Sequence, residues 1–276
     1  MRIARVFPRR TSATPDDGLC YFGLPKSNNQ ELDEVHISIT FTYDKAIGEY
    51  MAQQWQSKGY NVKLGGPVYG KPAGEFTPGL YLKKGITITS RGCNNRCWFC
   101  RVPKTQGNLI ELPVKDGWIV QDDNLLACSE LHIKKVFEML GRQPEKPKFP
   151  GGLEAKLLRP WHVELLHKVR TQQMFFAYDT EDDYEPLVEA GKLLNEFDFT
   201  LKKRKSWAYV LIGYPGDNFA NAEKRLKNTL AAGFMPFAML YKPECGFEDP
   251  AWKPFQRAWC RPAAIVSGNK EFFRTM

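Results

Sequence analysis

Three cysteines, Cys93, Cys97 and Cys100, are separated by three and then two residues in a short polar stretch. They come directly after residues 85–89, an alternating apolar run that is typical of a strand. Clustered thiols at this spacing are ligands for iron. Because four thiolates normally close a four-iron cluster, three cysteines leave one iron open to a small molecule that chelates it through an amine and a carboxylate. The spacing therefore predicts a [4Fe-4S] cluster with one open iron.

Zinc is the alternative occupant of such a group. Structural zinc sites generally use cysteine pairs two residues apart with a fourth Cys or His nearby, whereas within thirty residues of this trio the sequence offers only Cys128. The loop also contains Arg91, Asn94, Asn95 and Arg96, which indicate a polar surface turn and not a buried structural trio. Iron is therefore the better interpretation.

The CxxxCxxC loop, with Trp98 and Phe99 before its third cysteine, resembles the signature of the radical S-adenosylmethionine (SAM) superfamily. The resemblance implies that the three cysteines bind the cluster, that SAM binds the open iron, and that Trp98 and Phe99 contact adenine, with packing of the loop as the alternative for Phe99. It also implies reductive cleavage of SAM to a 5′-deoxyadenosyl radical that abstracts hydrogen from a substrate, driven by a one-electron donor such as flavodoxin or ferredoxin.

The elements that position these groups follow a strand-then-helix order. Apolar runs predict strands, and amphipathic stretches between them predict helices. The strands are expected at residues 85–89, 118–120, 148–149, 174–178, 206–212 and 235–240, with helices at 129–140, 160–171, 184–195 and 221–232. This pattern predicts an α/β fold with a parallel sheet, and the resemblance implies an open (β/α)6 partial barrel.

Polar or glycine clusters follow the predicted strands, and in parallel β/α folds the carboxyl ends of the strands form the site. The resemblance implies contacts to the SAM amino group from Asp122 and Asp123 or from Gly151, Gly152 and Glu154, to ribose from Asp179 and Thr180, and to adenine from Ile212 and Gly213. The alternatives are a turn that caps a helix for Asp122 and Asp123, an ion pair for Glu154, and an N-cap for Asp179 and Thr180.

The first 77 residues are expected to form a separate small lobe. Residues 1–34, rich in Pro, Ser, Asn and Asp, are interpreted as an extended arm, and residues 35–41, 44–59 and 61–66 as a strand–helix–strand unit. This unit resembles a shortened cobalamin-binding domain of one radical SAM branch, with functionally unassigned bacterial and phage members. Cobalamin itself is not expected, because His36 lies within a strand pattern and no D-x-H-x-x-G loop is present.

The domains are therefore residues 1–77, a barrel at 78–243, and an aromatic-rich tail at 244–276 that packs on the barrel. Cys245 and Cys260 in this tail are more typical of buried small residues than of a second cluster. No apolar run is long enough to cross a membrane, and an odd number of cysteines, seven, favours a reducing, cytoplasmic location. The formal net charge of +8 makes nucleic acid a candidate partner.

Two alternatives to an unspecified substrate stay open. One is a radical SAM enzyme that modifies tRNA or DNA; tRNA methylthiotransferases of this kind carry an RNA-binding module and a second cysteine trio, and neither is visible in the sequence. The other is an iron–sulfur protein that keeps the fold without turnover. The sequence specifies neither the substrate nor the oligomeric state.

Overall fold

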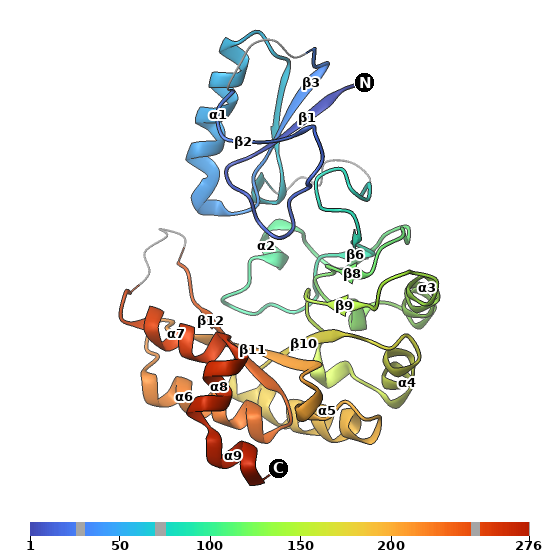
Figure 1. Cartoon of the computed structure of the whole chain (residues 1–276), viewed down its shortest axis with the longest axis vertical. Helices are drawn as coiled ribbons and strands as arrows, with labels where there is room; N and C mark the ends of the chain where they lie inside the picture. Colours follow the sequence, from blue (N-terminus) through green and yellow to red (C-terminus); the bar gives the residue numbers. More distant parts are fainter. Residues whose placement is uncertain (26–30, 70–75, 244–248, 276) are drawn as a thin grey trace. The chain divides into compact units, whose positions relative to one another are not determined.

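The computed structural model describes residues 1–25, 31–69, 76–243 and 249–275. The chain divides into two compact units, Met1–Trp118 and Ile119–Met276, whose elements are labelled along the chain in Figure 1. The domain boundaries expected from the motifs, after residues 77 and 243, stay predictions.

The first unit contains a four-stranded, fully parallel sheet in the order β2-β1-β3-β4. The predicted strand–helix–strand unit is confirmed, because β3 and β4 pair in parallel and α1 lies between them in the chain. The elements are β1 Ile3–Phe7, β2 Cys20–Phe22, β3 Glu34–Ser38, α1 Lys45–Ser57 and β4 Val62–Gly65.

The arm predicted for residues 1–34 is more than an arm, since it contributes two of the four strands. Strand β1 lies between β2 and β3, and its residues Ala4 and Val6 are fully buried. The strand was missed because Arg5 interrupts its apolar run. Arg5 is nonetheless buried, and its guanidinium pairs with Asp17 and donates to the Leu80 carbonyl oxygen at 3.2 Å.

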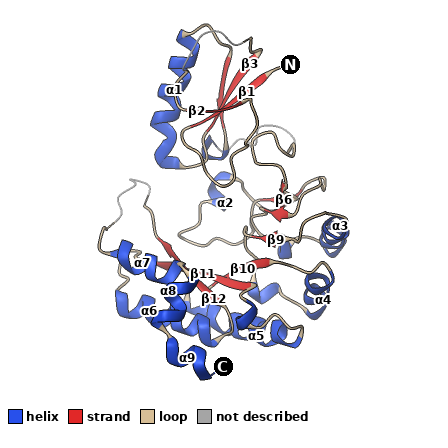
Figure 2. Ribbon diagram, viewed as in Figure 1, coloured by secondary structure: helices blue, strands red, loops and turns tan. Residues whose placement is uncertain are grey.

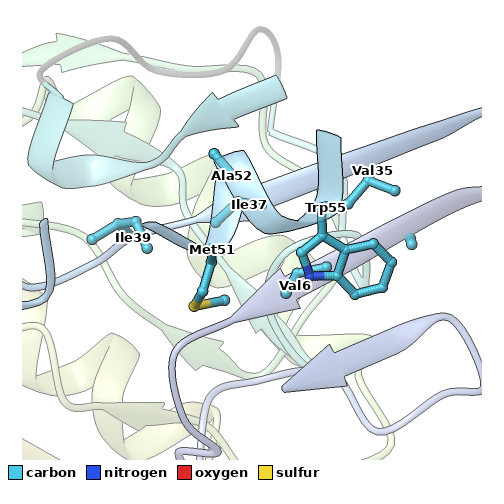
Figure 3. Close-up of a cluster of buried hydrophobic side chains, with 8 residues drawn as sticks. Val6, Val35, Ile37, Ile39, Met51, Ala52 and Trp55 are labelled. Atoms are coloured by element: carbon cyan, nitrogen blue, oxygen red, sulfur yellow. The ribbon is translucent and has the colours of Figure 1, made fainter. Parts of the chain in front are cut away.

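The core of this sheet is an apolar cluster that joins it to α1 (Figure 3). Each side chain of the cluster is at most 7% exposed, and a buried aliphatic side chain contributes about 1.5–3 kcal/mol. The indole of Trp55 also donates to the Gly23 carbonyl oxygen at 3.1 Å. The members are Ala4, Val6, Val35, Ile37, Ile39, Met51, Ala52 and Trp55.

The described remainder of the first unit consists of short elements. They are β5 Ile86–Thr87, β6 Ser90–Arg91, α2 Val102–Thr105 and β7 Ile110–Glu111. Strand β5 lies within the predicted strand at 85–89.

The second unit is built on parallel strands that pair in chain order. Strands β8 to β12 each pair with the next, without a reversal of direction or of order. The predicted α/β class with a parallel sheet is confirmed. The strands are β8 Ile119–Val120, β9 Lys148–Phe149, β10 Gln173–Ala177, β11 Ser206–Ile212 and β12 Met235–Leu240.

Helices alternate with these strands along the chain (Figure 2). Each predicted helix is present, with bounds that differ from the expected ones by a few residues. Ser129, expected as the first residue of the helix at 129–140, is instead the cap of α3 and accepts a hydrogen bond from the His132 amide. The helices are α3 Glu130–Gly141, α4 Pro160–Lys168, α5 Tyr184–Glu196 and α6 Phe219–Ala231.

The C-terminal residues form three helices, which the sequence interpretation did not specify. Helix α7 packs on strand β12, where the Gln256 side-chain amide and the Cys260 thiol both donate to the Ala238 carbonyl oxygen, at 3.3 and 3.1 Å. Cys245 lies outside the described residues. The helices are α7 Trp252–Cys260, α8 Pro262–Gly268 and α9 Lys270–Thr275.

No helix in the described ranges combines the length and apolar character needed to span a bilayer.

Candidate functional site

The cysteine loop is enclosed by a short antiparallel pair of strands. Ser90 and Arg91 of β6 pair with Glu111 and Ile110 of β7, so residues 92–109 leave the sheet and return to it. The hairpin fixes both ends of the segment that contains the three cysteines.

Polar residues of the loop hold its outgoing and returning parts together. Gly92 has φ +79°, and a Cβ atom there would lie 2.1 Å from the Asn108 carbonyl oxygen, so only glycine fits. The Cys93 amide donates to the Gly107 carbonyl oxygen at 3.2 Å, and the Leu109 amide donates to the Asn94 side chain at 3.2 Å. The asparagine that the sequence marked as a surface turn residue therefore anchors the loop.

The thiols lie at the accessible part of this loop. Cys97 is exposed and Cys93 and Cys100 are half-buried. The Asn95 amide donates to the Cys93 sulfur at 3.4 Å. The Cys100 amide donates to the Cys97 carbonyl oxygen at 3.0 Å, which forms a turn between the last two cysteines.

Chemically, this donor set fits an iron–sulfur cluster, since it offers three accessible thiols on one anchored loop and an amide directed at one of them. Within the described ranges, no three His, Cys, Asp or Glu side chains are gathered into a group that could hold a metal ion. Ligation of a cluster by the three cysteines is accordingly a proposal.

Next to the cysteines, Trp98 and Phe99 contact each other edge to face, with ring centroids 5.4 Å apart. Trp98 is 54% exposed. An indole this accessible can stack on a flat base.

In the second unit, the loops that follow β8 and β9 are joined. The Asn124 side-chain amide donates to the Glu154 carboxylate at 2.5 Å, and the same carboxylate lies 2.7 Å from the Lys156 ammonium. Gly151 lies so close to the first loop that a Cβ atom there would be 2.2 Å from the Asp122 carbonyl oxygen. Glu154 thus takes the structural role of an ion-pair member, and its contact with Asn124 holds the two loops together.

Asp122 in the first of these loops is 2% exposed, while Asp123 is half-buried. Gly152 has φ +103° and open space where a side chain would be. The structure therefore brings together four of the residues predicted to contact the SAM amino group, Asp122, Gly151, Gly152 and Glu154.

The residues after β10 have two different roles. Thr180 is the N-cap of the short helical turn that follows and forms a capping box with Asp183, whose carboxylate accepts from the Thr180 amide and hydroxyl at 2.8 and 3.0 Å. The carboxylate of Asp179 accepts a hydrogen bond from the Leu211 amide at 2.9 Å, which joins the ends of β10 and β11. Burial raises the pKa of Asp179 to about 7, against the opposing effect of that hydrogen bond.

At the end of β11, Ile212 is fully buried and Gly213 has φ +69°. A Cβ atom on Gly213 would lie 2.7 Å from a methyl carbon of Leu240 and 3.0 Å from the Trp252 indole. The Trp252 indole of α7 thus packs against Gly213, and the adenine contact predicted for Ile212 and Gly213 stays a prediction.

An ion pair beneath these loops was not predicted from the sequence. Arg225 and Asp217 lie 2.8 Å apart with side chains only 9% and 0% exposed. Arg225 also donates to the Leu211 carbonyl oxygen at 2.9 Å, and Asp217 accepts from the Gly213 amide at 2.8 Å. The sequence could have indicated a buried partner for Arg225, because this arginine lies on the apolar face of α6. The buried residues of that face are Ala222, Arg225, Leu226, Thr229 and Leu230.

Tyr209 of β11 is a second residue that the sequence interpretation missed. Its hydroxyl donates to the Pro150 carbonyl oxygen at 3.0 Å, and its ring stacks on Phe175 at 4.5 Å. Burial raises the pKa of Tyr209 to about 12, so it stays a neutral donor that fixes the start of the Gly151–Gly152 loop.

No protein-family model matches the chain. The chain is similar to ribosomal protein uS12 methylthiotransferases RimO. It is 32% identical over 128 residues to the protein of Hydrogenovibrio crunogenus, covering 41% of this chain and 26% of that protein. It is 27% identical over 148 residues to the protein of Ralstonia nicotianae, which covers 50% of this chain and 32% of that protein. It is also 27% identical over 143 residues to a protein from Xanthomonas oryzae pv. oryzae, which covers 46% of this chain and 29% of that protein.

The matches span between a quarter and a third of the length of these curated relatives. RimO proteins are radical SAM methylthiotransferases, so the similarity supports the predicted superfamily and the prediction of an enzyme. It does not support the predicted link to the functionally unassigned branch, because the relatives found have an assigned function.

Proposed function

We propose that this protein is a radical SAM enzyme that binds a [4Fe-4S] cluster through Cys93, Cys97 and Cys100. The observation that carries the proposal is the CxxxCxxC spacing on a loop anchored at both ends by β6 and β7. Similarity to uS12 methylthiotransferases supports it.

When bound, the cluster would supply the electron that cleaves SAM to methionine and a 5′-deoxyadenosyl radical, which abstracts hydrogen from the substrate. The chain's own part is to bind, orient and exclude water. Trp98 and Phe99 would cover the adenine ring, and the loops with Asp122, Asp123 and Gly152 would accept hydrogen bonds from the SAM ammonium.

Of the remaining predicted SAM contacts, we keep the contact of Asp179 with the ribose, because this residue directly follows the carboxyl end of β10. Its carboxylate also accepts from the Leu211 amide of β11. Thr180 and Glu154 are assigned the structural contacts described above. For Ile212 and Gly213 we propose a backbone contact to adenine next to the Trp252 indole.

For the fold of this region we propose an open (β/α)6 partial barrel. The pairing of β8 to β12 in chain order supports it, because a doubly wound sheet would reverse its strand order at a switch point.

The substrate and the outcome of the reaction are open in this proposal. Residues 1–92 contain a single cysteine, Cys20, and so do not supply the second cysteine trio that methylthiotransferases carry. The step that we propose is abstraction of hydrogen from the substrate by the 5′-deoxyadenosyl radical. We further propose a cytoplasmic protein that receives electrons from flavodoxin or ferredoxin.

The test is anaerobic reconstitution with iron and sulfide, followed by addition of dithionite and SAM. We expect the wild-type protein to release 5′-deoxyadenosine, measured by liquid chromatography, and Cys97→Ala to release none and to lose the cluster absorbance. The matched control is Cys20→Ser, a half-buried cysteine of β2, which should retain both.

Full activity of Cys97→Ala would refute the proposal. A wild-type protein with an intact cluster whose electron paramagnetic resonance spectrum does not change with SAM would favour the non-catalytic iron–sulfur protein instead.

A further inference from the structure

The second unit has a pocket at the amino ends of its strands, the opposite edge of the sheet from the loops described above. It has a volume of about 370 Å³. His167, Lys168 and Arg170 line it from the end of α4, Phe197 and Phe199 from the end of α5, and Lys205 from the residue before β11.

Positive charge dominates this pocket. Its lining includes the cations Lys168, Arg170 and Lys205, and the one carboxylate among the lining residues, Asp198, is paired with Lys203. Burial lowers the pKa of Lys205, and so do the neighbouring charges of Lys203 and Lys146. Such mutual repulsion is relieved by an anion.

Around the pocket, three charged residues adopt a backbone conformation that glycine usually occupies. In the described part of the chain, the non-glycine residues with positive φ are Arg170, Asp198 and Arg204, at 57°, 66° and 51°. Helices α1 and α6 place glycines, Gly59 and Gly233, at the corresponding position after their ends.

Glycine is the residue that adopts this conformation without strain, whereas other residues incur a cost of about 1–2 kcal/mol. All three strained residues lie in or beside the one pocket. Backbone conformations of this kind cluster at functional sites.

Aromatic rings complete the lining. The exposed His167 ring lies edge-on to the rings of Phe197 and Phe199, with centroids 6.4 and 6.2 Å apart. The Lys205 ammonium lies over the Phe199 ring at 5.5 Å. Cations beside aromatic rings are the composition of sites that bind single-stranded nucleic acid, where phosphates meet the cations and a base stacks on a ring.

We propose that this pocket binds a single strand of nucleic acid, with phosphates at Lys168, Arg170 and Lys205 and a base against His167 and Phe197. The proposal is independent of the radical SAM function, because it concerns the opposite edge of the sheet and its test measures binding alone. An acidic protein segment would satisfy the cations but would not need the rings.

The decisive variant is Arg170→Gly, which removes a cation and also relieves the backbone. It should therefore fold at least as stably as the wild type, which separates lost binding from lost structure. The matched control is Lys224→Ala, which removes an exposed lysine from α6.

Binding is measured by fluorescence anisotropy of a labelled uridine 12-mer against the full chain, at several salt concentrations. We expect Arg170→Gly to weaken binding roughly fivefold to tenfold near 0.1 M salt and to lower the salt slope by about 1. Lys224→Ala should match the wild type. Equal affinity and salt slope for Arg170→Gly and Lys224→Ala would overturn the proposal.

A second comparison tests the rings. His167→Ala should weaken binding of the uridine 12-mer severalfold but leave binding of an abasic strand of equal length unchanged. A polyglutamate peptide of equal charge that competes as well as the 12-mer, together with no effect of His167→Ala, would overturn the proposal in favour of an acidic protein partner. A deoxythymidine 12-mer in the same assay distinguishes DNA from RNA.

Discussion

The buried Arg225–Asp217 pair holds the turn after β11, and its removal should have a large effect on stability. One guanidinium nitrogen, Nη2, donates to both the Asp217 carboxylate and the Leu211 carbonyl oxygen, at 2.8 and 2.9 Å. The same carboxylate oxygen accepts from the Gly213 amide. The pair therefore connects α6 to the loop that we propose to contact adenine.

Arg225→Met keeps the aliphatic length of the side chain but removes its charge. The Asp217 side chain, which is 0% exposed, would then be a buried carboxylate without a cation. Breaking a buried pair in this way costs about 3–5 kcal/mol. At about 2–4 °C per kcal/mol for a unit of this size, the unfolding midpoint should fall by roughly 6–20 °C.

The assay is thermal unfolding followed by circular dichroism. The control Lys227→Met removes an exposed lysine on the same helix that pairs with Glu223, worth only about 0.3–0.5 kcal/mol, so its midpoint should move by no more than about 2 °C. Adding Asp217→Asn to Arg225→Met should recover part of the loss, because no buried charge is left and the amide oxygen still accepts from Gly213. Similar midpoints for Arg225→Met and Lys227→Met would refute the reasoning.

Two further predictions concern the polar loops. Gly151→Ala should lower the unfolding midpoint by roughly 2–12 °C, because its Cβ atom would meet the Asp122 backbone. The control is Gly141→Ala, whose Cβ atom meets nothing within 4 Å. Equal midpoints for the two variants would contradict the prediction. Asp179 has a pKa raised to about 7 in the folded chain against about 3.9 when unfolded, so its contribution to stability is full below pH 4 and is lost as the pH rises to 7. The midpoint of Asp179→Asn, which keeps the oxygen that accepts from Leu211, should match the wild type at pH 4 and exceed it at pH 8; a constant difference across this range would show that Asp179 is not the titrating group.

The strands and helices of the second unit could be predicted because their signals are local. Strand β11 is a seven-residue apolar run in which six residues are buried, and α3 begins at a serine cap. Strand β1 could not be predicted in this way, because Arg5 lies in the middle of it. Its burial depends on Asp17 and on Leu80, which is 75 residues away, and no local pattern reveals such partners.

The candidate site shows the same division between local and distant contacts. Thr180 has its partner Asp183 three residues later, so the capping alternative was visible in the sequence. Glu154 has its partner Asn124 thirty residues earlier, and only the folded chain shows that the loops after β8 and β9 hold each other. The spacing of the cysteines is local, and for that reason the proposed metal ligands are the part of the site that the sequence indicates most directly.

The aromatic C-terminal segment also depends on distant contacts, and its role follows from the position of β12. This strand is the last of its sheet, and an uncovered edge strand invites pairing with other chains. Helix α7 covers it, since Gln256 and Cys260 both donate to Ala238 and the indole of Trp252 packs on Gly213. The same helix thus protects the edge of the sheet and packs against the turn after β11, so the segment is part of the second unit. Any ligand that binds at this turn must fit beside the Trp252 indole.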